Sequence, residues 1–452
     1  MTRQALPRAA ERFDPSAFST FRFTGRSLDA AGRVSLRYAL DDVIAFEERF
    51  ELPVPPEGAP DAAEGLLALL HWVAGVSYFK TALPPAVACE TGAPPPATGA
   101  LLEALYSEGL GELAVVNSLP TLPRPAFAAG PPVATTAPRP SRRVLVPVGG
   151  GKDSAVALEV VRRSGAETAL FSVGAAPPIE RTVAAAGLPW LRATRRIDPQ
   201  MPALNARGAI NGHVPVTAIV SCVALLTAAL HGFDAVALAN ERSASAGNTT
   251  LDGVEVNHQF SKGERAERLL SAAVAETGSG LRAFSILRPA SELAIARAFA
   301  RLRPYHAAFT SCNRVFRLDP ALRASSWCGD CDKCRFVFLI LAPFLGPEEL
   351  RAIFGSDLLD DEAQFAGFAL LTATGGDKPF ECVGEVDESV AAIRLLATDP
   401  RWREHRVVRR LVAEVLPRFG PGDGDPERAL ALSERHAVPP ELIGDVRALL
   451  GA

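Results

Sequence analysis

The sequence predicts an α/β protein with a parallel, doubly wound sheet, an N-terminal α+β domain and a helical C-terminal region. One observation behind this prediction is a strand–turn–helix pattern in residues 142–159. A second is that apolar, β-branched runs alternate with helical patterns between residues 143 and 303, which is typical of a parallel sheet covered by helices on both faces. A third is an antiparallel pattern near the N-terminus, which a Pro/Ala-rich stretch at 122–141 separates from the alternating region.

The N-terminal part combines short strands with helices. Apolar and polar side chains alternate through residues 21–53, with turn residues between them, which predicts three antiparallel strands. Broad apolar faces predict helices in 61–80 and 98–110. The Pro/Ala-rich stretch has no periodicity, and we interpret it as a linker. The expected units are an N-terminal α+β domain at 1–121, the linker at 122–141, an α/β domain at 142–345 and a helical region at 346–452.

The alternating region supplies the elements of the parallel sheet. Strands are expected at 143–148, 168–173, 189–194, 234–239 and 283–287, and helices at 153–164, 178–186, 214–231, 263–277 and 290–303. Ligands of such sheets bind beyond the carboxyl ends of the strands. The loop that follows the first of these strands is therefore where we expect a binding site.

Composition narrows the class of protein. A chain of 452 residues, of which 48% are hydrophobic, suggests roughly two or three domains with large cores. The net charge of −4 argues against a dedicated nucleic-acid binder. We see no signal peptide and no apolar stretch of membrane-spanning length, so we expect a cytoplasmic protein without membrane insertion. Seven cysteines in such a chain favour a metal site or a catalytic role over disulfides.

A glycine-rich loop ends the first strand of the parallel region. Glycines let the backbone approach a ligand, and the N-terminus of the following helix attracts an anion such as phosphate. The Walker A pattern fails at Val146 and Asp153, and the dinucleotide fingerprint fails at Ser154. The loop instead resembles the SGGxDS loop of the PP-loop ATP pyrophosphatases, which split ATP into AMP and pyrophosphate. The matching residues are Gly149, Gly150, Gly151, Lys152, Asp153 and Ser154.

This resemblance implies an adenine nucleotide alpha-hydrolase-like sheet. Gly149 stands where the family pattern has its first serine, so one hydroxyl contact to phosphate is missing. Lys152 offers a positive charge in its place. The alternative is a glycine-rich turn at a helix N-cap that binds no ligand.

Two polar segments are expected near the same edge of the sheet. Asn240 and Glu241 follow a predicted strand and open onto the edge that carries the glycine-rich loop. A second segment supplies donors and a cation suited to phosphate or carboxylate recognition. It contains Asn257, His258, Gln259, Ser261 and Lys262. The alternative is a solvated loop in which Ser261 is a helix N-cap and Glu264 completes a capping box.

Two single residues are further candidates for proton transfer. His213 lies in the connection that follows the third strand of the parallel region, and a histidine there matters only if the loop faces the nucleotide. Cys382 has Lys378 and Glu381 close to it in sequence, and its thiol exchanges a proton if its pKa is lowered. A lone cysteine is otherwise a small, buried apolar residue.

Four cysteines have the spacing of a metal site. Two overlapping Cys-x-x-Cys units with a fourth cysteine upstream provide tetrahedral thiolate ligation for Zn²⁺ or for an iron–sulfur cluster. Our first interpretation is a structural Zn²⁺ that joins the sheet to the helical region, and the alternative is a set of free buried thiols. The candidate ligands are Cys312, Cys328, Cys331 and Cys334.

Most of the chain resembles one family, the ATP-dependent UDP-N-acetylmuramoyl-L-alanyl-L-glutamate epimerases of peptidoglycan synthesis. The resemblance implies that the terminal L-Glu of UDP-MurNAc-L-Ala-L-Glu is converted to D-Glu while ATP, with Mg²⁺, is consumed to AMP and pyrophosphate. The segments that carry it are FEERFELP (46–53), PVGGGKDS (147–154), NHQFSKG (257–263), FTSCNRVF (309–316), WCGDCDKCRFVF (327–338) and KPFECVG (378–384).

The resemblance also implies roles for the candidate residues. The backbone of residues 149–152 and the Ser154 hydroxyl would hold the ATP phosphates, and Asp153 would bind Mg²⁺. Lys262 would neutralise the charge that develops on the leaving group. The candidates for the proton-transfer groups are Cys382, His258 and His213, which the sequence does not rank, and those for further nucleotide contacts are Asn240, Glu241, Asn257 and Ser261.

Other functions remain open at this stage. One is a different PP-loop adenylating enzyme, such as a tRNA thiolase whose cysteines hold an iron–sulfur cluster, or an enzyme that forms an amide or a nitrile. Another is a nucleotide-binding protein without turnover. The oligomeric state is also left open.

Overall fold

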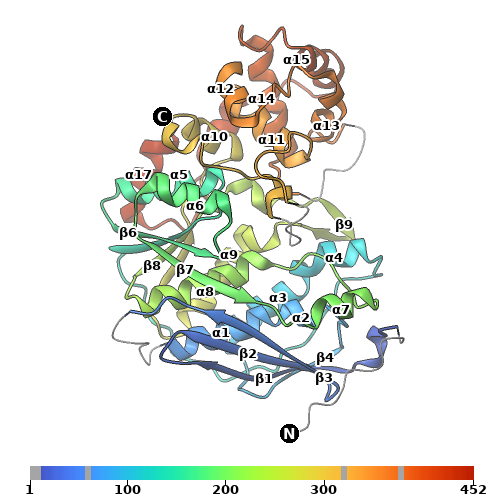
Figure 1. Cartoon of the computed structure of the whole chain (residues 1–452), viewed down its shortest axis with the longest axis vertical. Helices are drawn as coiled ribbons and strands as arrows, with labels where there is room; N and C mark the ends of the chain where they lie inside the picture. The colour runs from blue at the N-terminus through green and yellow to red at the C-terminus, as the bar shows by residue number, and fades with distance from the viewer. Residues whose placement is uncertain (1–11, 56–62, 317–322, 375–380, 452) are drawn as a thin grey trace.

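The computed structural model describes residues 12–55, 63–316, 323–374 and 381–451. Within these ranges, nine strands form one sheet in the order β11-β8-β5-β6-β7-β3-β2-β1-β4 (Figure 1). The strands are β1 (Thr20–Leu28), β2 (Arg33–Leu40), β3 (Ile44–Glu51), β4 (Ala86–Cys89), β5 (Arg143–Pro147), β6 (Glu167–Val173), β7 (Trp190–Arg196), β8 (Ala235–Leu238) and β11 (Arg282–Ser285).

One part of the sheet is parallel, as the alternating pattern predicts. β11, β8, β5, β6 and β7 pair in parallel, and a helix follows each of them within a few residues of the expected range. These helices are α5 (Lys152–Arg163), α6 (Pro177–Ala186), α8 (Val216–Leu230), α9 (Glu264–Ala275) and α10 (Glu292–Ala300). β5 lies between β6 and β8, so the chain reverses direction across the sheet at β5. Such a switch point is where doubly wound sheets bind ligands.

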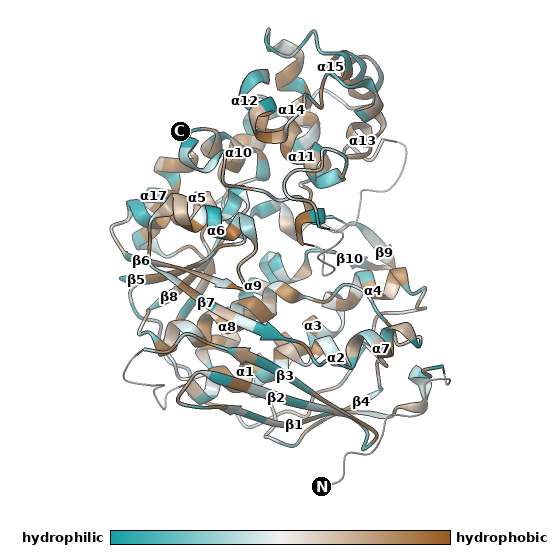
Figure 2. Cartoon of the chain, in the orientation of Figure 1, coloured by the Kyte–Doolittle hydropathy of each residue, from teal (hydrophilic) through white to brown (hydrophobic). Residues whose placement is uncertain are grey.

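The other part of the sheet is the predicted N-terminal meander. β1, β2 and β3 are antiparallel, and their buried and exposed residues alternate because one face packs on the core. Hydropathy alternates along β2 and β3 in the same way (Figure 2). β3 also pairs with β7 through residues 49–51. A single sheet therefore joins the segments on both sides of residues 122–141.

Buried helices fill the space behind the meander. α1 (Glu64–Ala74) packs against α8, and α3 (Pro96–Tyr106) packs against α9. α8 is apolar around most of its circumference, which is typical of a helix covered on all sides. The core thus brings N-terminal helices next to those that cross over the parallel strands.

The C-terminal region is helical, as expected. α11 (Asp332–Leu341) packs against α10 and α14 (Val386–Thr398), and α17 (Pro440–Leu450) packs against α5 and α10. The other helices of this region are α12 (Pro347–Phe354), α13 (Phe365–Leu370), α15 (Arg406–Arg410) and α16 (Pro426–Leu430). Helices α11 to α15 lie at the end of the molecule opposite the meander (Figure 1). In the described part of the chain, every helix is too short or too polar to span a lipid bilayer.

Candidate active site

The glycine-rich loop connects β5 to α5 at the switch point. Gly150 has a φ of 81°, and a Cβ there would lie 2.6 Å from Pro178, so a side chain does not fit. A Cβ on Gly149 would meet no atom of the described residues within 4 Å, so among these residues this part of the backbone is open to a ligand. Gly151 is the N-cap of α5 and offers no side-chain cap. The backbone N–H groups of the first turn are therefore suited to bind an anion.

A second segment fixes the shape of this loop. The Thr310 N–H donates to the Gly150 carbonyl at 2.9 Å. A Cβ on Gly151 would lie 2.8 Å from the Ser311 hydroxyl oxygen. The loop therefore packs directly against the segment that ends in Cys312.

The Lys152 side chain points into the protein. Its ammonium is buried and forms ion pairs with the carboxylates of Asp153 and Glu292. Burial alone lowers the pKa of Lys152, but these two carboxylates outweigh it and hold the pKa above its usual value. The Asp153 side chain remains 26% exposed, and the Ser154 hydroxyl donates to the Gly151 carbonyl at 2.9 Å. The Lys152 charge, which the sequence analysis expected to face a phosphate, is thus buried and paired with two carboxylates.

Asn240 and Glu241 are also buried. The Asn240 amide donates to the Ser285 hydroxyl at 3.1 Å, which ties the ends of β8 and β11 together. Burial, and next the charge of Glu292, raise the pKa of Glu241 to about 7. The Glu241 carboxyl group can therefore hold or release a proton near neutral pH.

Lys262 lies beside Cys382. Its Nζ lies 3.5 Å from the Cys382 Sγ and 3.3 Å from the Gln259 Oε1. Burial lowers the pKa of Lys262, but the charges of Cys382, Glu241 and Asp153 outweigh it and raise the pKa above its usual value. Charged groups that are far apart in the sequence thus act on the one ammonium group that lies beside Cys382.

Cys382 and His258 form a pair with opposite charges. Burial alone raises the pKa of Cys382, but the charge of Lys262 and a hydrogen bond from His258 outweigh it and lower the pKa to about 6. Burial alone lowers the pKa of His258, but hydrogen bonds to Cys382 and Glu112 outweigh it and raise the pKa to about 9. Between these two values, a thiolate faces an imidazolium.

His213 lies beside this pair. Its ring centroid is 4.5 Å from that of His258, and its Nδ1 is 3.8 Å from the Glu112 carboxylate. Burial, and next the positive charge of His258, lower the pKa of His213 to about 4. His213 is therefore neutral at physiological pH.

Asn257 forms hydrogen bonds that hold the loop at residues 257–262, whereas Ser261 lies in a short helix of that loop. The Asn257 amide donates to the Ala244 carbonyl at 2.9 Å, and its oxygen accepts from the Gln259 N–H at 2.7 Å. Ser261 lies in a short 3-10 helix, η5 (Phe260–Lys262).

The alternative of a capping box at Ser261 and Glu264 is wrong. α9 begins at Glu264 with Gly263 as its N-cap, and the Glu264 N–H donates to the Ser245 hydroxyl at 3.0 Å. The Ser245 hydroxyl, 19 residues before Glu264, therefore accepts the hydrogen bond that was predicted for the Ser261 hydroxyl.

Lys378, which the sequence places near Cys382, lies outside the described residues.

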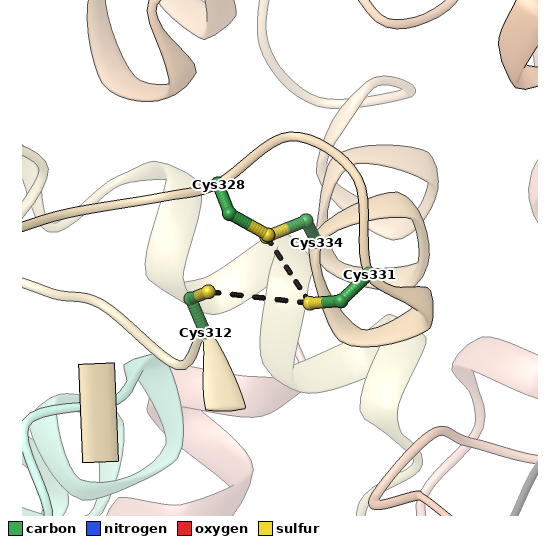
Figure 3. A group of neighbouring side chains, drawn as sticks. All are labelled: Cys312, Cys328, Cys331 and Cys334. Carbon is green, nitrogen blue, oxygen red and sulfur yellow. Dashed lines mark hydrogen bonds between the residues drawn. The ribbon is translucent and has the colours of Figure 1, made fainter. Parts of the chain in front are cut away.

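The four predicted cysteines come together (Figure 3). Their sulfur atoms all lie within 4.8 Å of one another. The Cys331–Cys334, Cys328–Cys334 and Cys312–Cys331 sulfur distances are 3.5, 3.7 and 4.0 Å. A tetrahedral Zn²⁺ site with Zn–S bonds of about 2.3 Å has sulfurs about 3.8 Å apart. The donor set and its spacing therefore fit one zinc ion, whereas a cluster of several irons needs more room between the thiolates.

Three residues of the site were missed by the sequence analysis. Glu112 lies in α4 (Gly111–Val116), and no local pattern connects it with His258. Glu292, at the start of α10, pairs with Lys152, and only an acidic first turn marks it. Lys333 lies 3.6 Å from the Glu292 carboxylate and stands between Cys331 and Cys334 of the second Cys-x-x-Cys unit, which was the one available signal.

Two family models and several curated relatives match this chain, and together they cover nearly all of it. The family model for the MurL N-terminal domain matches residues 12–286, and that for the MurL C-terminal domain matches residues 308–422. A relative from Xanthomonas oryzae pv. oryzae (strain MAFF 311018), named UDP-N-acetyl-alpha-D-muramoyl-L-alanyl-L-glutamate epimerase, is 42% identical over 96% of this chain and 98% of its own length.

Two further relatives bear the same name, one from Salinispora tropica and one from a Micromonospora species. Both are 47% identical over 87% of this chain, which covers 88% and 90% of their lengths. No solved structure gives a significant match. Since the two family models and these relatives together span the sheet, the site and the cysteine cluster, the chain belongs to the MurL family.

Proposed function

We propose that the protein is an ATP-dependent epimerase that converts the terminal L-Glu of UDP-MurNAc-L-Ala-L-Glu to D-Glu. The name of its relatives supports the substrate and the isomerase reaction. The observation that carries the proposal is a chain of contacts from the glycine-rich loop to Cys382: Lys152 pairs with Glu292, Glu292 lies 3.6 Å from Lys333, and Lys333 donates to the Cys382 carbonyl. This supports a site in which one group would activate a carboxylate and another would move a proton.

ATP would bind at the glycine-rich loop. The open backbone at Gly149 and the N-terminus of α5 suit its phosphates, and the Ser154 hydroxyl lies in the same turn. Asp153, with its partly exposed carboxylate, would hold Mg²⁺, which would neutralise phosphate charge. Lys262 would offset the charge on the departing pyrophosphate.

Adenylation makes the proton at Cα removable. A substrate carboxylate oxygen attacks the α-phosphorus of ATP, pyrophosphate leaves, and the carboxyl group loses its negative charge. A base then takes the Cα proton, because the electron pair of the C–H bond can move onto the activated carbonyl. A proton added to the opposite face inverts the centre, and hydrolysis releases AMP. Each unit by which adenylation lowers the pKa of the Cα–H group lowers the free energy of removing that proton by about 1.4 kcal/mol.

The cysteine cluster would hold one structural Zn²⁺. Its ligands flank the site, because Cys312 follows the segment that fixes the glycine-rich loop and Cys334 follows Lys333. Zinc would supply no chemistry to the reaction but would hold these two segments together.

Incubation with UDP-MurNAc-L-Ala-L-Glu, ATP and Mg²⁺ in deuterated water tests the proposal. We expect deuterated D-Glu in the recovered dipeptide and AMP in the nucleotide fraction. Asp153→Asn is expected to lower AMP formation at least a hundredfold. A product with a changed mass apart from the deuterium would indicate amide or nitrile formation, and ATP binding without pyrophosphate release would indicate a protein without turnover; either result would overturn the proposal.

A further inference from the structure

We propose that Glu112, His258 and Cys382 form a proton-transfer triad, in which the Cys382 thiolate takes the Cα proton on one face of the activated glutamyl residue and Glu112 orients His258. This inference rests on the proposed function and deepens it. It assigns a residue to one of the two faces of Cα at which a proton is removed or added. It also gives Glu112, in the N-terminal part of the chain, a role in orienting a catalytic group.

The surroundings of Cys382 favour a thiolate. Lys262 approaches its sulfur from η5, and Lys333 of α11 donates to the Cys382 carbonyl. His258, from the loop that follows β10 (Val254–Val256), also helps to lower the pKa of the Cys382 thiol. Glu381 is the nearest acidic neighbour in sequence, and its carboxylate accepts from the Lys333 N–H at 3.2 Å. The charges that act most strongly on the sulfur are therefore positive.

Glu112 holds the imidazole in place. Its carboxylate accepts a hydrogen bond from the Nδ1 of His258, across 146 residues of sequence. Because Nδ1 is engaged in this way, Nε2 is the nitrogen left to face the thiolate. A carboxylate, an imidazole and a nucleophilic or basic atom in this sequence form the arrangement in which the carboxylate sets the tautomer and stabilises the imidazolium. Glu112 is thus a positioning residue for Cys382.

A metal site is the competing interpretation of the same groups. The ligand atoms of Glu112, His213 and His258 lie within 4.8 Å of one another. However, His258 uses its Nδ1 to bond Glu112, and the Lys262 ammonium stands close to the same thiolate. A divalent cation would have to break the hydrogen bond and lie near a fixed positive charge. We therefore favour proton transfer.

The proton step balances with these groups alone. The C–H bond at Cα breaks and an S–H bond forms at Cys382, while the C–H electron pair moves onto the carbonyl oxygen of the acyl adenylate. The Lys262 ammonium, 3.5 Å from the Cys382 sulfur, would stabilise the resulting negative oxygen if the activated carboxyl group binds beside it. In the reverse direction the thiol returns its proton to the same face.

The first test needs no substrate. The rate at which iodoacetamide alkylates Cys382 is followed by peptide mass spectrometry from pH 4.5 to pH 10. We expect the rate in the unaltered protein to rise with a midpoint close to the pKa of about 6. Glu112→Gln is expected to shift the midpoint up by about one unit, which lowers the rate at pH 6 roughly fivefold. His258→Gln should shift the midpoint in the same direction.

Glu108→Gln is the matched control. Glu108 lies four residues before Glu112 and forms an exposed ion pair with Arg265, so its loss should leave the midpoint unchanged. A Glu112→Gln profile that coincides with the control would overturn the triad. So would a second bound metal ion, beyond that of the cysteine cluster, which elemental analysis finds in the unaltered protein and no longer finds in His213→Gln.

The second test separates the triad from the proposed function. Cys382→Ser is assayed for two reactions in one sample, the exchange of labelled pyrophosphate into ATP and the incorporation of deuterium at Cα. We expect deuterium incorporation to fall at least a thousandfold while pyrophosphate exchange persists. If the unaltered protein shows no exchange, the proposed function fails. If exchange is normal and Cys382→Ser still incorporates deuterium at the unaltered rate, only the triad fails.

Discussion

The Lys333 ammonium donates a hydrogen bond to the Cys382 carbonyl and so joins the helix of the cysteine cluster to the loop of the candidate base. The same ammonium lies 3.6 Å from the Glu292 carboxylate, which pairs with Lys152 beneath the glycine-rich loop. One side chain therefore contacts both halves of the site.

Replacement of Lys333 should alter the acidity of Cys382. Lys333→Met removes a positive charge that favours the thiolate, so the pKa of Cys382 should rise from its value of about 6. The alkylation midpoint measures this shift. Lys333→Arg keeps the charge and is the control. An unchanged midpoint in Lys333→Met would contradict the electrostatic role assigned to this residue.

Loss of the cluster metal should weaken ATP binding as well as stability. The Cys312 segment holds the glycine-rich loop through Thr310 and Ser311, so release of Cys312 loosens the loop. We expect one zinc per chain by elemental analysis, and at least a tenfold loss of ATP affinity by calorimetry in Cys331→Ser. Cys89→Ser, in β4, is the control and should keep both properties. A brown protein with several irons per chain would refute the zinc assignment.

The buried pair of Lys152 and Glu292 should contribute strongly to stability. Lys152→Met leaves the Glu292 carboxylate with less compensation in a buried position, which costs roughly 3–5 kcal/mol of unfolding free energy. Glu292→Gln in the same chain should recover part of this loss, and urea unfolding measures both variants. Arg447→Met breaks the exposed pair with Glu434 and should cost less than about 1 kcal/mol. Equal losses of unfolding free energy in Lys152→Met and Arg447→Met would contradict the prediction.

His71 should make the N-terminal core sensitive to acid. Burial lowers the pKa of His71 to about 4, while its Nε2 bonds the Arg37 carbonyl at 3.1 Å. Below pH 6.5 the unfolded chain takes up a proton that the folded chain refuses, so stability falls as the pH falls towards 4. The slope for one proton is about 1.4 kcal/mol per pH unit.

His71→Gln is the test of this dependence. Glutamine keeps a donor for the carbonyl but does not titrate. The difference in unfolding free energy between the two proteins should therefore shrink from pH 7 to pH 4. A difference that stays constant over this range would show that His71 does not cause the acid sensitivity.

The sequence predicts the local features of this protein well. The five strands and five helices expected between residues 143 and 303 follow from periodicity, because each pattern lies within one short segment, whereas the shorter α7 (Met201–Ala206), β9 (Thr249–Leu251) and β10 were not predicted. The cysteine cluster follows from spacing for the same reason. The contact of Glu112 with His258 and the pairing of β3 with β7 join segments far apart, and neither leaves a mark on its own segment. These two contacts depend on how the folded chain packs, which no pattern within a single segment reveals.

The pairing of β3 with β7 has a consequence for attempts to shorten the protein. A fragment that starts at Arg143 would leave the backbone groups of Thr194, Arg195 and Arg196 without the neighbour that they have in the full chain. A bare strand edge invites pairing between molecules, so such a fragment should aggregate. Anyone who wants a minimal catalytic piece has to begin ahead of the meander.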